Sequence, residues 1–222
     1  MTVWAVLAAA GSGERLGADR PKAFVRLGDR PLLAESLERL DASPWVDAIV
    51  VAAPPGWEEP VILLAEELAC GKVVAAVTGG ATRAASVRAA LAEVPEDAAV
   101  VLVHDAARPL LPDDVVERVV APLSEGWDGV VPALPVPDTV KRVRDGAVVE
   151  TLDRAELVLV QTPQAFVAPV LREAAAGEGS DCASLVEARG GRVKVVAGDR
   201  RLQKVTTRED LDLVAGLLGS AR

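Results

Sequence analysis

The sequence predicts an α/β domain built on a doubly wound, mostly parallel β-sheet. Apolar, β-branched runs alternate with segments of helical spacing along most of the chain. The runs are continuously apolar rather than alternating, which is typical of strands that are covered on both faces. Hydrophobic residues make up 50% of the 222 residues, enough for a real core, and this excludes a disordered chain. We expect a single domain over residues 1–222.

The strands and helices follow from these runs in chain order. Apolar runs predict strands at residues 4–9, 48–53, 73–77, 100–104, 129–133 and 193–196. Helical spacing predicts helices at 32–40, 58–68, 83–93, 112–120 and 209–218. The fourth helix opens with Pro-Asp-Asp, and a capping-box pattern begins at Thr207 before the last one.

The stretch 136–152 departs from this alternation. Its two short runs, 141–144 and 147–151, flank Asp145-Gly146, which is a typical hairpin turn. A charged hairpin has little core of its own. We therefore expect this β-arm to pack against a second subunit.

The charge balance limits the choice of partners. Lys plus Arg number 24 and Asp plus Glu number 33, so the net charge is −9. Such a chain lacks the broad positive field that non-specific nucleic-acid binding needs, and aromatic residues at 3% are too few for stacking platforms. We expect no nucleic-acid partner, and any polyanion must meet a local cluster of cations.

Cysteine, histidine and apolar run lengths limit the compartment and the metal chemistry. Two cysteines cannot build a disulfide framework, and a single His cannot anchor a His-based zinc site. No apolar run approaches the ~18 residues of a membrane span. The short apolar start, 3–10, has no Lys or Arg before it and favours a buried strand over a signal peptide. These features predict a cytoplasmic protein without membrane contact.

A glycine-rich loop follows the first strand and carries the first candidate site. It reads AAAGSGERLG over residues 8–17, and Pro21-Lys22 comes shortly after. Small residues let backbone N–H groups approach phosphate oxygens, while Arg15 and Lys22 add positive charge that suits a triphosphate. The spacing is neither a Walker loop nor a dinucleotide fingerprint. The alternative is a plain turn with solvated charges, which the combined loop and Pro-Lys pair disfavour.

A second glycine turn, Gly79-Gly80, leads into Arg83 and Ser86. These residues could surround a nucleobase or ribose, with Arg83 shaping the pocket, or they could simply make a turn with a solvent-facing Arg. The residues alone leave both interpretations open.

Asp105 directly follows a buried strand, and so it should lie at the carboxyl edge of the sheet beside the glycine loop. Mg²⁺ binds one carboxylate together with substrate phosphates, and we prefer this role to a helix N-cap. A phosphate nucleophile is already ionised and needs no base, so we expect His104 to be structural. Lys204, before the last helix, could reach the same site or face water.

Taken together, the motifs resemble those of the 2-C-methyl-D-erythritol 4-phosphate cytidylyltransferase family. The resemblance runs from residue 3 to about residue 217, in AAAGSGERLG…PK, GG-x-x-R-x-x-S, VHDAARP, DTVK, DR, TPQ-x-F and KVT-x-x-EDL. It implies a Rossmann-like nucleotidyltransferase fold of about seven mostly parallel strands, with one antiparallel member and helices on both faces. It also implies a homodimer that interlocks through the β-arm, 136–152.

The resemblance further implies a reaction and its site. CMP would pass from CTP to 2-C-methyl-D-erythritol 4-phosphate with release of pyrophosphate, with Mg²⁺ as cofactor. The catalytic cations would be Arg15, Lys22 and Lys204. The nucleotide would contact Ala9, Ala10, Gly11, Gly80, Arg83, Ser86, Asp105 and Ala106, with Asp105 also binding the metal.

The acceptor sugar phosphate would contact a further set of residues. Arg108 and Thr139 would face its hydroxyls, while Thr162, Lys204 and Arg154 would clamp its phosphate, Arg154 crossing from the partner's arm. The sequence departs from the family pattern at two positions. Ala81 stands where relatives usually carry a polar or acidic residue, and Cys182 stands where they usually carry an acidic residue.

Three alternatives share parts of this pattern. A ribitol 5-phosphate cytidylyltransferase has most of the motifs, and the sequence separates it incompletely. A guanylyltransferase of molybdenum-cofactor synthesis has a similar glycine loop but lacks VHDAARP. A non-catalytic nucleotide-binding regulator would have no need of the cations Lys22 and Lys204 around an α-phosphate.

Overall fold

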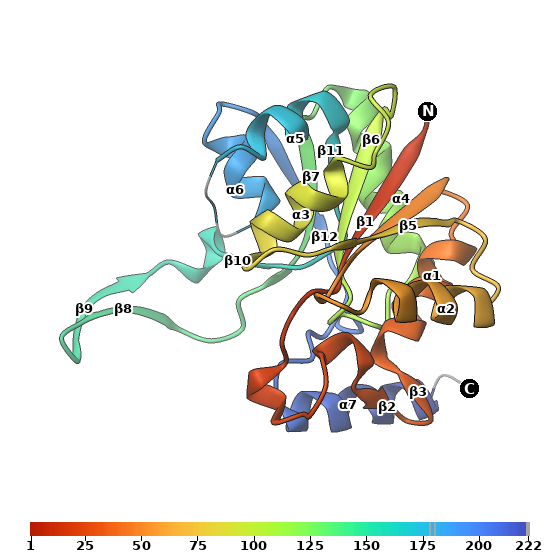
Figure 1. Cartoon of the computed structure of the whole chain (residues 1–222). Coiled ribbons are helices and arrows are strands. Elements are labelled where there is room, and N and C mark those ends of the chain that lie inside the picture. Colours follow the sequence, from red (N-terminus) through yellow and green to blue (C-terminus); the bar gives the residue numbers. More distant parts are fainter. Residues whose placement is uncertain (178, 180, 221–222) are drawn as a thin grey trace.

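A mixed β-sheet forms the centre of the computed structural model, which describes residues 1–177, 179 and 181–220 (Figure 1). Its strands are β1 (Val3–Ala8), β4 (Ala48–Ala53), β5 (Val73–Thr78), β6 (Val100–Asp105), β7 (Gly129–Pro135), β10 (Val158–Val160), β11 (Gln164–Val167) and β12 (Val193–Ala197). Across the sheet the order is β12-β7-β11-β6-β1-β4-β5, with β10 also paired to β7. The six predicted strands are therefore confirmed, each with bounds shifted by no more than two residues.

The antiparallel position of the sheet is shared by two strands. β11 pairs with β7 near Val130, and β10 pairs with the same strand near Leu134, both antiparallel. Residues 161–163 separate the two strands, although the Gln161 N–H still donates to the Pro132 carbonyl of β7 (2.8 Å). The described sheet thus has eight strands in seven positions, and one position is antiparallel, in agreement with the expected doubly wound fold.

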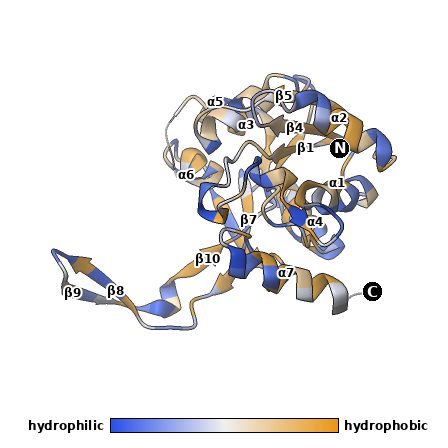
Figure 2. Cartoon of the chain, turned by 60° about the horizontal axis from the view of Figure 1, so that its bottom comes forward, coloured by the Kyte–Doolittle hydropathy of each residue, from blue (hydrophilic) through white to orange (hydrophobic). Residues whose placement is uncertain are grey.

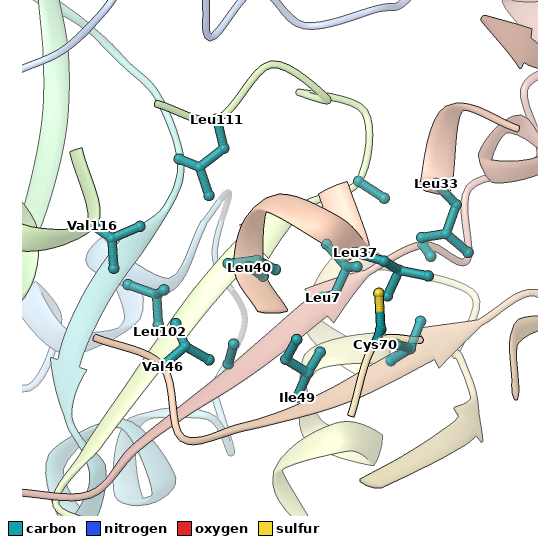
Figure 3. Close-up of a cluster of buried hydrophobic side chains, with 14 of the residues drawn as sticks. Leu7, Leu33, Leu37, Leu40, Val46, Ile49, Cys70, Leu102, Leu111 and Val116 are labelled. Carbon is teal, nitrogen blue, oxygen red and sulfur yellow. The ribbon is translucent and has the colours of Figure 1, made fainter. Parts of the chain in front are cut away.

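Helices cover both faces of the sheet, as expected. One face packs against α1 (Leu32–Ala42), α2 (Glu58–Glu67) and α4 (Asp113–Val120), and the other against α3 (Arg83–Leu91), α5 (Ala168–Ala174) and α6 (Cys182–Glu187). In β1, Leu7 belongs to the first apolar layer and Val6 to the second. Figure 3 shows part of the first layer, where Leu37 and Leu40 of α1 lie over Leu7 and Ile49. This double burial explains why the strands are continuously apolar.

A third, smaller apolar cluster attaches the last helix, α7 (Arg208–Ser220), to the edge of the domain. It joins Leu211 and Val214 of α7 to Leu16 of the glycine loop and to Val205, beside Lys204. The predicted capping box is confirmed, because the Thr207 N–H donates to Asp210 Oδ2 (2.9 Å) and the Asp210 N–H to Thr207 Oγ1 (3.3 Å). The cluster therefore fixes two segments that carry candidate site residues.

The remaining elements are short. They are the strand pair β2 (Arg26–Leu27) and β3 (Arg30–Pro31), and the 3₁₀ turns η1 (Glu14–Leu16), η2 (Lys22–Phe24), η3 (Ala121–Glu125) and η4 (Arg154–Glu156). In the described residues, no helix is both long and apolar enough to pass through a membrane.

The predicted hairpin is confirmed as β8 (Val140–Arg144) and β9 (Ala147–Leu152). Asp145 (φ 49°) and Gly146 (φ 78°) both have positive φ, which a two-residue turn of type I′ requires. The arm extends far from the body (Figure 1), and three of its valines, Val143, Val148 and Val149, are exposed, Val148 by 60%. The hydrophobic strand β10 lies at its root (Figure 2).

Candidate functional site

A cavity of about 210 Å³ lies where β1 and β6 end, and we call it the glycine-loop cavity. Ala8 and Asp105, the last residues of these strands, are direct neighbours in the sheet register. The sheet edge thus brings the glycine loop and the acidic residue together, as expected. The predicted site residues in its lining are Ala9, Ala10, Gly11, Arg15, Lys22, Arg83, Asp105, Ala106 and Lys204.

The glycine loop folds back onto Lys22. The Lys22 N–H donates to the Gly11 carbonyl (3.2 Å), and Gly13 has a positive φ of 78°. A Cβ at Gly13 would also lie 3.1 Å from Lys22 Cβ. Only glycine meets both demands at low cost, so this residue lets the loop bring a lysine to the cavity wall.

Asp105 is the electrostatic centre of the cavity. Its carboxylate accepts from Arg83 Nε (2.8 Å) on one oxygen and from Lys204 Nζ (2.8 Å) on the other. Burial by itself would raise the pKa of this carboxyl, but Arg83 and Lys204 hold the pKa well below its usual range. A helix N-cap role is excluded, since the next helix begins only at Asp113.

Lys22 lies close to two other positively charged side chains, Lys204 and Arg15. Burial, followed by repulsion from Lys204 and Arg15, lowers the pKa of the Lys22 ammonium to about 8, although Asp105 and Asp210 oppose the shift. Above that pH the free protein loses one of the cations of the cavity. A bound anion would reverse the shift, because it favours the charged form.

The second glycine turn packs tightly against the cavity. A Cβ at Gly79 would lie 2.2 Å from Ala10 Cβ, so the close approach requires glycine. The Ser86 hydroxyl accepts the Gly80 N–H (3.1 Å) and donates to the Thr82 carbonyl (3.0 Å). Neither Gly80, which is exposed, nor Ser86, which is buried, is in the lining of the glycine-loop cavity, and their mutual hydrogen bonds shape the turn.

Arg83 bridges three segments of the chain. Besides Asp105, its Nη1 contacts Cys182 Sγ (3.5 Å), and its Nη2 is buried without a hydrogen-bond partner among the residues that the structure describes. Burial raises the pKa of the Cys182 thiol, although Arg83 opposes this. Cys182 is therefore a weak, neutral neighbour for the guanidinium.

A second, larger hollow of about 840 Å³ lies beside β10, and we call it the β10 hollow. Arg108 lines it, and its guanidinium also donates to the Leu202 carbonyl (2.5 Å). Lys204 lines this hollow as well as the glycine-loop cavity. Sequence reasoning missed other polar residues of its wall, among them Gln161, Asp181, Ser184 and Gln203. Only the Asp-x-x-Ser cap before α6 offered a sequence signal for two of them.

Thr162 and the arm residues lie elsewhere. The Thr162 hydroxyl is buried between His104 and the main chain of Asp105, and Thr162 is in the lining of neither hollow. Thr139 and Arg154 line a third hollow at the root of the arm, where Arg154 donates to the Pro137 carbonyl (2.5 Å). A single chain thus does not bring these two residues to the other predicted site residues.

The residues available for a metal are few. In the described ranges, no group of three or more His, Cys, Asp and Glu side chains could hold an ion. Asp105 offers a carboxylate whose oxygens each keep a free lone-pair site beyond their bond to a cation. This donor set fits an ion that arrives with oxygen ligands of its own, as Mg²⁺ does on phosphates.

Comparisons with known proteins point to one family. The family model described as 2-C-methyl-D-erythritol 4-phosphate cytidylyltransferase matches residues 3–220. A protein of that name from Nocardia farcinica is 48% identical over 98% of this chain and 94% of its own, and one from Saccharopolyspora erythraea is 46% identical over 98% and 100%. The crystal structure of the Thermus thermophilus protein of that name is 36% identical, has a TM-score of 0.78, and covers 96% of this chain and 98% of its own.

The charges around Lys22 predict how its pKa responds to substitution. Lys204→Met should raise the Lys22 pKa above about 8, because a repelling charge is removed, and Asp105→Asn should lower it, because an attracting charge is removed. NMR titration of the lysine side chain measures both shifts. Glu125→Gln, which breaks an ion pair with Lys194 outside the cavity, is the matched control. Shifts of the opposite sign would contradict this account of the cavity.

Proposed function

The chain belongs to the 2-C-methyl-D-erythritol 4-phosphate cytidylyltransferase family, nucleotidyltransferases of the non-mevalonate isoprenoid pathway, and we propose how its site works. CTP binds in the glycine-loop cavity and 2-C-methyl-D-erythritol 4-phosphate in the β10 hollow. The acceptor's phosphate oxygen attacks the α-phosphorus in line, giving 4-diphosphocytidyl-2-C-methyl-D-erythritol and pyrophosphate. The observation that carries this arrangement is that Lys204 lines both hollows.

The charge of the glycine-loop cavity supports the nucleotide assignment. Arg15, Lys22, Arg83 and Lys204 line it against the single carboxylate of Asp105, in a chain with a net charge of −9. The cations are therefore gathered where a triphosphate would lie. Ala9, Ala10, Gly11 and Ala106 offer close main-chain approach to the ligand.

Catalysis in this proposal is positioning plus electrostatics. Negative charge grows on the non-bridging oxygens of the α-phosphate, and Lys22 and Lys204 neutralise it while Arg15 steadies the departing pyrophosphate. Lys204 Nζ lies 2.8 Å from Asp105 Oδ2 and lines both hollows. When the reactants bind, their phosphate oxygens compete with Asp105 for this ammonium group. The same cations overcome the repulsion between two polyanionic reactants.

Asp105 is the residue proposed to hold Mg²⁺. An ion on this carboxylate and the phosphates would supply additional positive charge at the nucleotide. Arg83 keeps the carboxylate ionised and oriented from the other side.

We assign the acceptor to Arg108, Lys204, Thr139, Arg154 and Thr162. Arg108 and Lys204 line the β10 hollow of their own chain. Thr139 and Arg154 would enter it from a partner, because they lie at the root of the exposed arm. For Thr162 we propose an indirect part, since its hydroxyl already bonds to two protein groups.

A homodimer that interlocks through the arm accounts for exposed apolar surface. Val143, Val148 and Val149 on the arm and Val158 and Leu159 on β10 are each more than 40% exposed in the single chain. Burying such a patch against a second copy is favourable. We also propose a cytoplasmic location, where reduced thiols such as Cys70 and Cys182 persist.

Pyrophosphate release tests the function directly. We expect the protein to release pyrophosphate from CTP with 2-C-methyl-D-erythritol 4-phosphate, and much more slowly with ribitol 5-phosphate at equal concentration. A coupled pyrophosphate assay measures both rates. Faster turnover of ribitol 5-phosphate would reassign the acceptor, and tight CTP binding without pyrophosphate release would indicate a regulator.

Removal of divalent metal tests the proposed role of Asp105. EDTA should stop turnover and excess Mg²⁺ should restore it, because Asp105 with phosphates forms the proposed metal site. Asp105→Asn should require more Mg²⁺ for half-maximal rate, whereas Asp128→Asn, outside the cavity lining, should not. Full activity in EDTA would remove the metal from the proposal.

Mixed dimers test the crossing arm. Lys22→Ala should lower turnover by about 10² to 10³, the usual effect of removing one preorganised charge, and Arg154→Ala should raise the acceptor KM about tenfold or more. Each variant alone is therefore impaired. Co-expressed, they should form heterodimers in which one site has an intact Lys22 and receives an intact Arg154, so activity with the native KM returns.

The mixed-dimer experiment has a control variant on the same arm. Arg142→Ala on the exposed arm, which loses only its pair with Glu150, should leave the acceptor KM unchanged. If mixing the two variants restores no activity, Arg154 does not serve the partner's site.

A further inference from the structure

His104 is a buried group that the proposed mechanism does not use. It precedes Asp105 on β6, is fully buried, and is the only histidine of the chain. Its Nε2 lies 3.1 Å from the Arg108 carbonyl oxygen, and its Nδ1 lies 3.1 Å from Thr162 Oγ1. The ring therefore joins Arg108 to Thr162, which is 54 residues further along the sequence.

The chemistry of the partners fixes the direction of each bond. A carbonyl oxygen can only accept, so Nε2 carries the ring proton and donates to Arg108. In the neutral ring Nδ1 is then an acceptor, and the Thr162 hydroxyl donates to it. Thr162 Oγ1 in turn accepts the Asp105 N–H (3.0 Å). Burial lowers the pKa of His104 to about 4, which agrees with a neutral ring.

Both segments held by the ring belong to the acceptor side of the site. Arg108 lines the β10 hollow, and its N–H closes the turn after β6 by donating to the Asp105 carbonyl (2.9 Å). Thr162 lies in the interruption between β10 and β11, next to Gln161 of the same hollow. The glycine loop, by contrast, has no hydrogen bond to His104 in the described structure.

We propose that His104 is a positioning residue for the acceptor, holding Arg108 and the Thr162 segment at the distance that the sugar phosphate requires. This rests on the proposed function, because it assumes that the β10 hollow binds the acceptor. His104 does not touch substrate. It acts through the Arg108 carbonyl and the Thr162 hydroxyl that it connects, so its loss should affect acceptor binding more than nucleotide binding.

Two substitutions separate the two bonds of the ring. In His104→Asn the side-chain amide reaches only the position of Nδ1, so it can accept from Thr162 but cannot reach Arg108. In His104→Gln the amide reaches the position of Nε2 and can donate to the Arg108 carbonyl, but it leaves Thr162 without its acceptor. Each should raise the acceptor KM about tenfold, with the CTP KM changing by less than about twofold.

Ser36→Ala is the matched control. Ser36 is also fully buried, and its hydroxyl donates to the Ala106 carbonyl (3.3 Å) in the same turn, but it has no hydrogen bond to Arg108 or Thr162 in the described structure. We expect its acceptor KM to stay within about twofold of the parent value. Equal increases in both KM values for the His104 variants, or the same acceptor effect in Ser36→Ala, would reduce His104 to general packing and overturn the proposal.

The unsubstituted protein provides a second test, the tautomer of His104. This test can still be carried out if the variants fail to fold or if the acceptor proves to be a different molecule. Because the chain has one histidine, the ¹⁵N NMR spectrum of tag-free protein reports this ring alone. We expect the tautomer with its proton on Nε2. A proton on Nδ1 would break the bond to Arg108 and overturn the proposal, whereas absence of turnover with either sugar phosphate would overturn only the proposed function.

Discussion

The ion pairs of Asp105 with Arg83 and Lys204 connect the separate parts of the site. The carboxylate ends a strand in the middle of the sheet, the guanidinium comes from the start of α3, and the ammonium comes from the segment before α7. Removing either cation would leave a buried charge partly uncompensated, which is costly in free energy. The fold can keep this carboxylate buried and ionised because two elements from opposite sides of the sheet edge supply positive charge.

The same arrangement explains how an acidic chain can attract anions. Its net charge is unfavourable at long range, but screening in physiological salt limits that effect to about 8 Å. Within the glycine-loop cavity, Arg15 and Lys22 add to Arg83 and Lys204. Burial, and after it repulsion from Lys204 and Arg15, lowers the pKa of the Lys22 ammonium. A polyanionic ligand relieves this repulsion, so the empty cavity is less favourable electrostatically than the filled one.

Most of the fold could be predicted from the sequence because its strands are buried on both faces and give continuous apolar runs. The prediction missed α5 and α6, which have seven and six residues and thus too few turns to show a helical period. It also missed β10 and β11. Their pairing depends on β7, a partner that local sequence does not reveal.

The site, like the fold, could be predicted from the sequence only in part. Asp105 and the glycine loop could be predicted to meet, since parallel strands end at one sheet edge, and the structure confirms that proximity. The contact of Arg83 with Cys182 spans 99 residues, and the bond of His104 to Thr162 spans 58. Neither follows a local spacing rule. Residue patterns therefore indicated which groups gather at the edge, but not which of them hold one another.

The attachment of α7 has a consequence for local opening of the protein. Every described strand of the central sheet ends by Ala197, and α7 packs on the small third cluster rather than in the two large apolar layers. Val205, beside Lys204, shares that cluster with Leu211 and Val214 of α7 and with Leu16 of the glycine loop. Detachment of α7 alone would therefore displace the ammonium of the site while the central core stays packed.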